Sequence, residues 1–154
     1  MPIIQNYALP LIMVGHYALN VIELLLKIFM TKIYSDGYTI GQNPSPIGGG
    51  YVVMNEAKEV LTEKEIQKVG MTNNEIELLG VLCATEVAGI SDEIITDSMN
   101  TYWWVMKRKC KARKDLKPIA EKAYKNICEK NLKLIQEGRE TNLAGNYIEF
   151  VLQK

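Results

Sequence analysis

The stretch LPLIMVGHYALNVIELLLKIFMTKIYSDG, residues 9–37, decides the expected fold because it is long, apolar and ends in a turn signal. It predicts a helix from about Pro10, which is tolerated in a first turn, to a stop at Ser35–Gly37. The polar side chains recur every three or four residues and so form one narrow stripe: His16, Asn20, Glu23, Lys27 and Thr31. A helix that is apolar over the rest of its surface is normally packed on several sides. The stretch therefore predicts a central helix of a bundle.

The segments that follow predict mostly helices. Capping boxes at Thr62 and Thr72, each with a glutamate three residues later, mark two helix starts. Further helices are predicted from Ser91 to about Cys110 and from Asp115 to about Gly138. The tail from Asn146 to Leu152 alternates weakly, which favours a strand slightly over a docked terminal helix.

A small β element is expected between the first two helices. Two β-prone runs, Tyr38–Ile40 and Tyr51–Met54, flank a Gly/Pro-rich loop at residues 41–50. They predict a projecting hairpin or an extended arm at about residues 35–55. The glycines do not make a phosphate loop, because no Lys-Ser/Thr pair and no helix follow them directly. The expected fold is thus mainly α: one domain, residues 1–154, with four to five helices, this hairpin or arm and possibly a C-terminal strand.

Composition limits the class of protein. The chain has 154 residues, 47% of them apolar, which is enough for one domain with a core. Cys83, Cys110 and Cys128 are odd in number and fit neither a disulfide framework nor a zinc site. No signal peptide is apparent at the N-terminus. We therefore expect reduced cysteines in a virion or a host cytoplasm, and no secretion.

The charges are sorted along the chain, although the 18 acidic and 18 basic residues cancel overall. Residues 56–97 carry ten acids and three bases, a net of −7, and residues 98–154 carry six acids and thirteen bases, a net of +7. Such poles favour charge-complementary association, within one chain or between subunits. Candidate subunit-interface residues from the hairpin and the acidic segment are Tyr38, Ile40, Ile47, Tyr51, Val53, Glu63, Glu65, Glu75 and Glu77.

The strongest binding signal is the stretch Tyr102–Lys114, in which two tryptophans precede six bases. Three interpretations stay open: the bases complement the negative end of a helix macrodipole, they pair with an acidic subunit, or they bind nucleic acid or anionic lipid. In the last case Trp104 could stack one turn from Arg108. The candidate binding residues are Trp104, Lys107, Arg108, Lys109, Lys111, Arg113, Lys114 and Lys117.

No motif indicates catalysis. His16 is the only histidine, and acid–base work would need a partner within hydrogen-bonding reach. The acid pairs Glu63/Glu65 and Asp92/Glu93 are explained by predicted helix starts, where acids complement the macrodipole. We therefore expect a protein that is not an enzyme, with no catalytic residues, metal or cofactor. A third hypothesis makes the N-terminal helix a membrane anchor, although a membrane partner is disfavoured by the charges within it.

One resemblance gives these features a common context. The order of elements resembles the head-to-tail adaptor (connector or tail accessory) proteins of short-tailed bacteriophages, through Ala18–Ile22, Ser35–Ile40 and Asn74–Ala84. The resemblance implies a non-enzymatic ring of identical subunits in a virion connector, bound to other assembly proteins. The alternatives are a helical nucleic-acid-binding module that uses residues 107–117 and a membrane-associated subunit.

Overall fold

The computed structural model describes residues 17–25 and 30–154. Residues 17–25 are helical, and residues 31–154 form a separate compact unit. Within the part of the chain that is described, the structure has no helix of the length and apolar character needed to cross a membrane. The predicted helix start at Pro10 and the single histidine, His16, lie outside the described residues.

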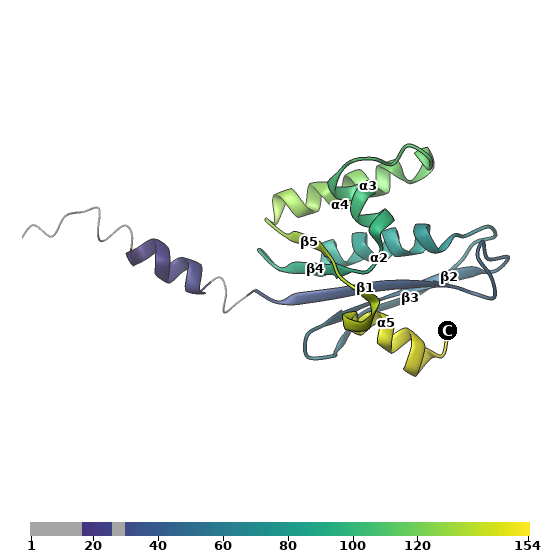
Figure 1. The fold of residues 1–154 in the computed structure, drawn as a ribbon, viewed down its shortest axis with the longest axis horizontal. Helices are drawn as coiled ribbons and strands as arrows, with labels where there is room; N and C mark the ends of the chain where they lie inside the picture. The colour runs from purple at the N-terminus through teal and green to yellow at the C-terminus, as the bar shows by residue number, and fades with distance from the viewer. Residues whose placement is uncertain (1–16, 26–29) are drawn as a thin grey trace, which may run out of the picture. The chain divides into compact units, whose positions relative to one another are not determined.

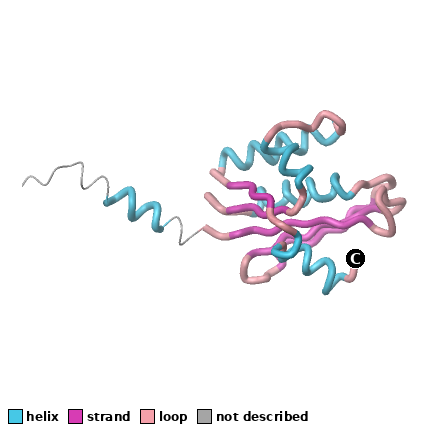
Figure 2. The backbone as a smooth tube through the Cα atoms, viewed as in Figure 1, coloured by secondary structure: helices cyan, strands magenta, loops and turns pink. Residues whose placement is uncertain are grey.

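The compact unit is built on one five-stranded mixed sheet (Figures 1 and 2). Its strands are β1 (Lys32–Thr39), β2 (Gly48–Asn55), β3 (Val60–Gln67), β4 (Glu93–Thr96) and β5 (Lys133–Gln136), in the spatial order β3-β2-β1-β4-β5. The first three pair antiparallel, whereas β4 pairs parallel with both β1 and β5. The central strand β1 therefore joins the antiparallel half to the parallel half.

Helices cover both faces of the sheet. On one face lie α2 (Asn73–Val87), α3 (Met99–Met106) and α4 (Lys117–Glu129), and on the other lie α5 (Leu143–Tyr147) and the π-helical turn Ile148–Leu152 (Figure 1). Short 3₁₀ turns occur at Lys114–Leu116 and Arg139–Thr141. The larger core lies under the first group of helices, around fully buried Ile76, Val81 and Ile94, and a smaller one lies under α5.

Two glycines bring α2 unusually close to β1. A Cβ at Gly37 would lie 3.0 Å from the backbone nitrogen of Glu77, and a Cβ at Gly80 would lie 2.6 Å from the hydroxyl of Ser35. These distances are shorter than a side-chain carbon tolerates. The absence of both side chains therefore sets the spacing between the two elements and places Glu77 directly over β1.

The expectation of a mainly α fold is wrong, and β1 shows why. Ser35–Gly37 does not end a helix but lies inside a strand that is paired on both edges. A strand in the middle of a sheet is covered on both faces, and the run KIYSDGYT of β1 shows no strict alternation of apolar and polar residues. Such a run cannot be distinguished from buried helix by periodicity.

Two predicted helix starts are also strands. Thr62 lies within β3, opposite Val53, because the ladder with β2 satisfies its backbone. At the start of β4 the carboxylate of Asp92 accepts hydrogen bonds from the amides of Thr31 (3.0 Å) and Gly89 (2.7 Å), so it fixes a turn rather than capping a helix.

The tail is helical rather than a strand, because the Asn142 side chain caps α5 by accepting from two amides of its first turn. The start of α2 at Thr72 is confirmed, since its hydroxyl accepts from the amide of Glu75. The two β-prone runs around residues 41–50 do form the hairpin of β1 and β2, although it lies within the sheet instead of projecting.

The acidic and basic poles pair with each other inside this unit. Four ion pairs join the acidic segment to the basic one: Arg113–Glu75 (3.5 Å), Lys122–Glu86 (3.0 Å), Lys133–Glu93 (4.0 Å) and Lys154–Glu65 (4.0 Å). Most are exposed, so each contributes little to stability. The sorted charges are thus partly matched within one chain, and they do not by themselves call for a second subunit.

Lys130 closes the C-terminal end of α2, and its loss should be measurable. Its ammonium donates to the carbonyls of Thr85 (2.9 Å), Glu86 (2.8 Å) and Ala88 (2.9 Å), which have no partner within the helix. We expect Lys130→Met to lower the free energy of unfolding by about 1–2 kcal/mol in urea denaturation. The matched control Lys125→Met changes an exposed lysine on α4, the helix that Lys130 directly follows, and should change the free energy of unfolding by less than about 0.5 kcal/mol. Equal effects would contradict the capping role.

Candidate active site

Asp36 is an acid buried in the middle of the sheet. It lies on β1 and is only 6% exposed, and its Oδ1 accepts a hydrogen bond of 2.8 Å from the amide of Gly37. Burial, followed by the charge of Asp97, raises its pKa from 3.8 to about 7. A buried carboxylate whose negative charge is poorly balanced by donors and positive charges lowers the stability of the fold. Such groups occur most often at functional sites.

Asp97 reaches the same place because β1 and β4 run parallel. Ser35 pairs with Thr96 in the ladder, so the residues that follow, Asp36 and Asp97, lie side by side. Ser98, the next residue, caps α3 and turns the chain away from the sheet. Burial raises the pKa of Asp97, and the nearby positive charge of Arg139 lowers it.

Glu77 completes the group from the helix above. It lies in the second turn of α2, where its carboxylate accepts a hydrogen bond of 2.9 Å from the Asn73 amide. Burial raises its pKa, the hydrogen bond from the Ser98 hydroxyl lowers it, and Asp97 raises it. The side chain is thus held between the first turn of its own helix and the start of α3.

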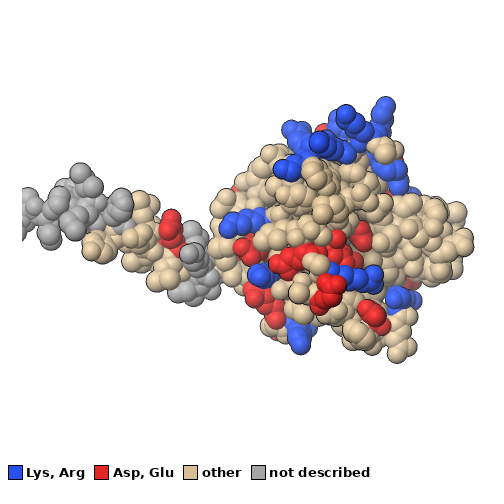
Figure 3. Space-filling model, viewed as in Figure 1, with Lys and Arg blue, Asp and Glu red and all other residues tan. Residues whose placement is uncertain are grey.

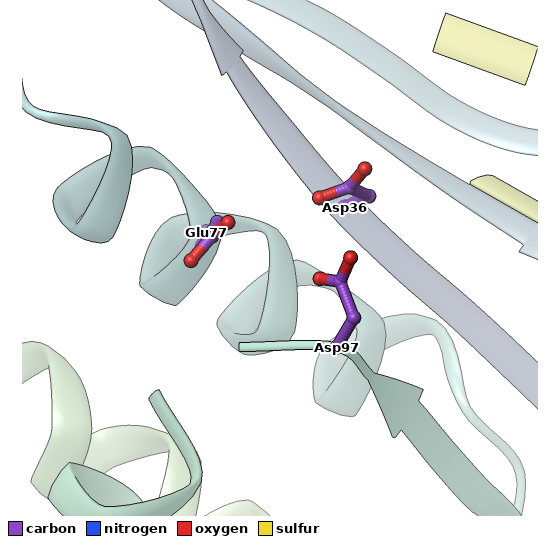
Figure 4. Close-up of side chains that lie close together, drawn as sticks. All are labelled: Asp36, Glu77 and Asp97. Carbon is purple, nitrogen blue, oxygen red and sulfur yellow. The ribbon is translucent and has the colours of Figure 1, made fainter. Parts of the chain in front are cut away.

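Together these three acids form a compact carboxylate cluster, defined here as Asp36, Glu77 and Asp97 (Figure 4). One oxygen from each lies within 4.8 Å of the others. The three come from a strand, a helix and the end of a second strand, so only the folded chain assembles them (Figure 4). The charge of Arg139, in the turn after β5, lowers the pKa of all three carboxyls.

The cluster fits a divalent cation. Carboxylate oxygens are hard donors of the kind that Mg²⁺ and Mn²⁺ prefer. The raised pKa values of all three groups show that their negative charges are under-compensated by the protein, which a cation between them would correct.

The C-terminal helix packs against the cluster from the other side of the sheet. Asn142, fully buried, donates to the carbonyl of Ser35 (3.0 Å), directly before Asp36. A Cβ at Gly145 would lie 2.8 Å from Oδ2 of Asp36. The backbone of α5 thus limits where the Asp36 carboxylate can lie.

The basic residues predicted to bind nucleic acid gather elsewhere on the same unit. They lie in and beside the basic loop, defined here as residues 107–114, which connects α3 to the turn before α4, and Figure 3 shows them together at one edge of the molecule. Lys109 lies over the ring of Trp103 (5.3 Å) and Arg108 over that of Tyr124 (5.5 Å). Trp104 instead lines a cavity between α3 and α4, of about 200 Å³, with Arg108.

Neither a family model nor a curated protein sequence matches the chain. Among solved structures, an RNase H1 from Halobacterium salinarum NRC-1 matches with a TM-score of 0.60 at 20% identity, over 81% of this chain and 99% of that one. The chain has the RNase H fold.

Two further structures agree with this assignment of the RNase H fold. The N-terminal RNase H domain of a Mycobacterium tuberculosis protein matches with a TM-score of 0.59 at 22% identity, over 76% of this chain and 93% of that one. LC11-RNase H1, in its complex with an RNA/DNA hybrid, matches with a TM-score of 0.55 at 25% identity, over 73% of this chain and 88% of that one.

The RNase H fold corrects the functional expectations. The resemblance to bacteriophage connector proteins is wrong, because the structures that share the fold are RNase H1 domains. The expectation of a non-enzymatic viral assembly protein is wrong for the same reason, since the chain shares the fold of RNase H1 domains and carries a cluster of three carboxylates within it. Nothing in these comparisons supports a ring of identical subunits.

The structure distributes the predicted interface residues over several environments. Tyr38, Tyr51 and Val53 are buried in the sheet, Ile40 is half-buried, and Ile47, Glu63 and Glu65 are exposed. Glu75 is buried beside Arg113. Glu77 belongs to the carboxylate cluster.

Asp36 and Asp97 are not among the functional residues predicted from the sequence. The signal that could have found them is the same for both. Asp97 directly follows the β-prone run Ile94–Thr96, and Asp36 follows the β-prone pair Ile33–Tyr34 after one serine. An acid after such residues is unusual in the buried face of a helix. It suits the point where the pairing of two parallel strands ends, because functional groups often lie at the carboxyl ends of such strands.

Proposed function

We propose that this chain is a metal-dependent ribonuclease that cleaves the RNA strand of an RNA/DNA hybrid. The observation that supports this most strongly is the cluster of three carboxylates, from β1, α2 and the end of β4, within a fold shared with RNase H1 domains. The substrate class is inferred from LC11-RNase H1, whose structure is of a complex with an RNA/DNA hybrid.

The three acids would hold the catalytic cation. Asp36 is held at both oxygens, because the amide of Gly37 donates to one and α5 packs close to the other. Glu77 is oriented by Asn73, and Asp97 is anchored at the start of α3. A divalent cation bound there supplies Lewis-acid activation of water and stabilises charge on the phosphate. The protein's own contribution is to hold three oxygens in a fixed arrangement before the substrate arrives.

Neutral amide side chains beside the cluster suit the sugar–phosphate backbone of RNA. Asn43 accepts from the backbone amide of Asn73 (3.0 Å), and Asn100 donates to Asn74 (3.2 Å). These residues come from the β1–β2 loop, the first turn of α2 and the first turn of α3, which bound the site around Glu77. Amides both donate and accept, and the ribose 2′-hydroxyl does the same, which distinguishes RNA from DNA.

The basic loop would supply affinity without sequence preference. Lys107, Lys109, Lys111 and Lys114 are exposed there and can approach phosphates. Each phosphate that a lysine neutralises releases counterions, so binding should weaken steeply with salt. We therefore assign the loop to backbone contacts and the amide-lined region beside the carboxylate cluster to the scissile strand.

A cleavage assay with several substrates tests the proposal. We expect the chain to cut the RNA strand of a labelled 20-base-pair RNA/DNA hybrid in Mg²⁺ or Mn²⁺ and to leave the DNA strand intact. EDTA should stop the reaction, because the three carboxylates alone supply no positive charge to stabilise the charge that develops on the phosphate. Single-stranded RNA and duplex DNA of the same sequence should be cut at least about tenfold more slowly, since each lacks one of the two expected strands. No cleavage with either cation, or equal cleavage of single-stranded RNA, would contradict the proposal.

A further inference from the structure

Arg113 lies in the basic loop but is engaged differently from its lysines. Its guanidinium donates from Nε and Nη2 to the two oxygens of Asp115, at 3.0 and 2.8 Å, and from Nη1 to the hydroxyl of Thr72, at 3.1 Å. The side chain of Arg113 is half-buried, with 30% of its surface exposed, whereas Lys109 and Lys111 are exposed to solvent. A planar fork that is held on two sides is a fixed group rather than a free charge.

The contacts of Arg113 end at the first turn of α2. Thr72 caps this helix, and the Nη2 of Arg113 lies 3.5 Å from an oxygen of Glu75. Glu75 is 4% exposed and also forms an ion pair with Lys68. Because Glu75 precedes Glu77 by two residues, the same helical turn that receives Arg113 leads into the carboxylate cluster.

The main chain around Arg113 is anchored as well. Its carbonyl accepts from the amide of Leu116 (3.0 Å) and from the thiol of Cys110 (3.1 Å), and both partners are buried. The lysines between these anchors have exposed side chains. The basic loop thus has one side chain that ties it to α2 and several that project from it.

We propose that Arg113 is a positioning residue that locks the basic loop onto α2 and so sets where the loop lysines meet the phosphate backbone of the substrate. This inference rests on the proposed function for the identity of that substrate. In this role Arg113 acts through the lysines rather than by touching a phosphate. Substitution of Arg113 should therefore remove more than one phosphate contact, although Arg113 carries only one charge.

Salt dependence separates positioning from direct contact. The dissociation constant of a fluorescein-labelled 12-base-pair RNA/DNA hybrid would be measured in EDTA from 50 to 300 mM KCl. For Lys111→Gln we expect the slope of log Kd against log [KCl] to fall by about one, the value for one lost phosphate contact. For Arg113→Gln we expect a fall of two or more. A fall of about one, or none, for Arg113→Gln would overturn the positioning role.

Two further variants make charge and geometry predict opposite results. Asp115→Asn removes a negative charge, so charge alone predicts tighter binding, whereas loosening of the Arg113 fork predicts binding at least threefold weaker. Arg113→Lys keeps the charge but loses the fork, so it should behave like Arg113→Gln. Tighter binding of Asp115→Asn, or near wild-type binding of Arg113→Lys, would overturn the proposal. Asp115 is exposed, so its substitution should leave the fold intact.

Amide hydrogen exchange of the free protein measures how firmly the basic loop is held in the absence of substrate. We expect exchange over residues 107–114 to become faster in Arg113→Gln and in Asp115→Asn but to stay unchanged in Lys111→Gln. Unchanged exchange in the first two variants would overturn the proposal. If the wild-type chain does not bind the hybrid at all, the proposed function fails, and this exchange measurement still decides whether Arg113 holds the loop.

Discussion

Asp36→Asn is expected to reduce cleavage of an RNA/DNA hybrid by about 10³-fold or more at saturating Mg²⁺. The substitution keeps the shape of the side chain and removes one of three negative charges that would hold the cation. Loss of a cation ligand removes several kcal/mol of stabilisation of charge that develops at the phosphate, and each 1.4 kcal/mol is a factor of ten in rate. The measurement is single-turnover cleavage of labelled RNA in the hybrid.

The matched control is Glu63→Gln, which makes the same kind of change at an exposed acid on β3. Its rate should stay within about twofold of the wild-type rate, because surface substitutions away from the site have small effects. Binding of the hybrid in EDTA should be retained or improved in Asp36→Asn, since a negative charge has been removed near a polyanion. Cleavage by Asp36→Asn at a rate near that of Glu63→Gln would show that the carboxylate cluster is not the active site.

The same substitution is expected to stabilise the metal-free protein at pH 8, by about 2–4 kcal/mol. Burial and the charge of Asp97 raise the pKa of Asp36 from 3.8 to about 7 in the folded chain. The ionised carboxylate is therefore less favourable in the fold than in the unfolded chain, and about 1.4 kcal/mol corresponds to each unit of that difference. Asparagine is neutral at every pH and avoids this cost.

The pH dependence has a definite sign. Above pH 7 the wild-type protein bears the full cost of the buried charge. As the pH falls from 7 toward 3.8, the folded chain takes up a proton that the unfolded chain does not, so the cost shrinks. Urea denaturation in EDTA should thus give a large difference between Asp36→Asn and wild type at pH 8 and a small one near pH 4.5. A difference that is equal at both values would contradict the assigned pKa.

Taken together, the two expected results describe one compromise. The acid that is most costly to bury is the one that catalysis requires, so the variant that gains stability loses activity. A divalent cation should reverse the stability difference in part, because it binds the folded wild-type protein and not the unfolded chain. This trade between stability and activity is common at active sites.

Some elements could be predicted from local sequence because local contacts fix them. Thr72 caps α2 through a hydrogen bond to an amide three residues away, and such a contact needs no tertiary structure. The two strands of the β1–β2 hairpin are connected by a loop of turn-forming residues. The basic character of residues 107–114 is likewise a property of the sequence, although the engagement of Arg113 with Thr72, 41 residues away, is not.

The tertiary structure alone decided the sheet and the site. Pairing of β1 with β4 joins segments about 60 residues apart, and neither strand shows the strict apolar–polar alternation that would distinguish it from helix in the sequence. Asp36 and Asp97 become neighbours only through that parallel pairing, and Glu77 joins them because Gly37 and Gly80 let α2 approach β1. The sequence by itself therefore determined the turn between β1 and β2, the start of α2 and the place where positive charge collects. The long-range packing of strands and glycines decided which acids meet.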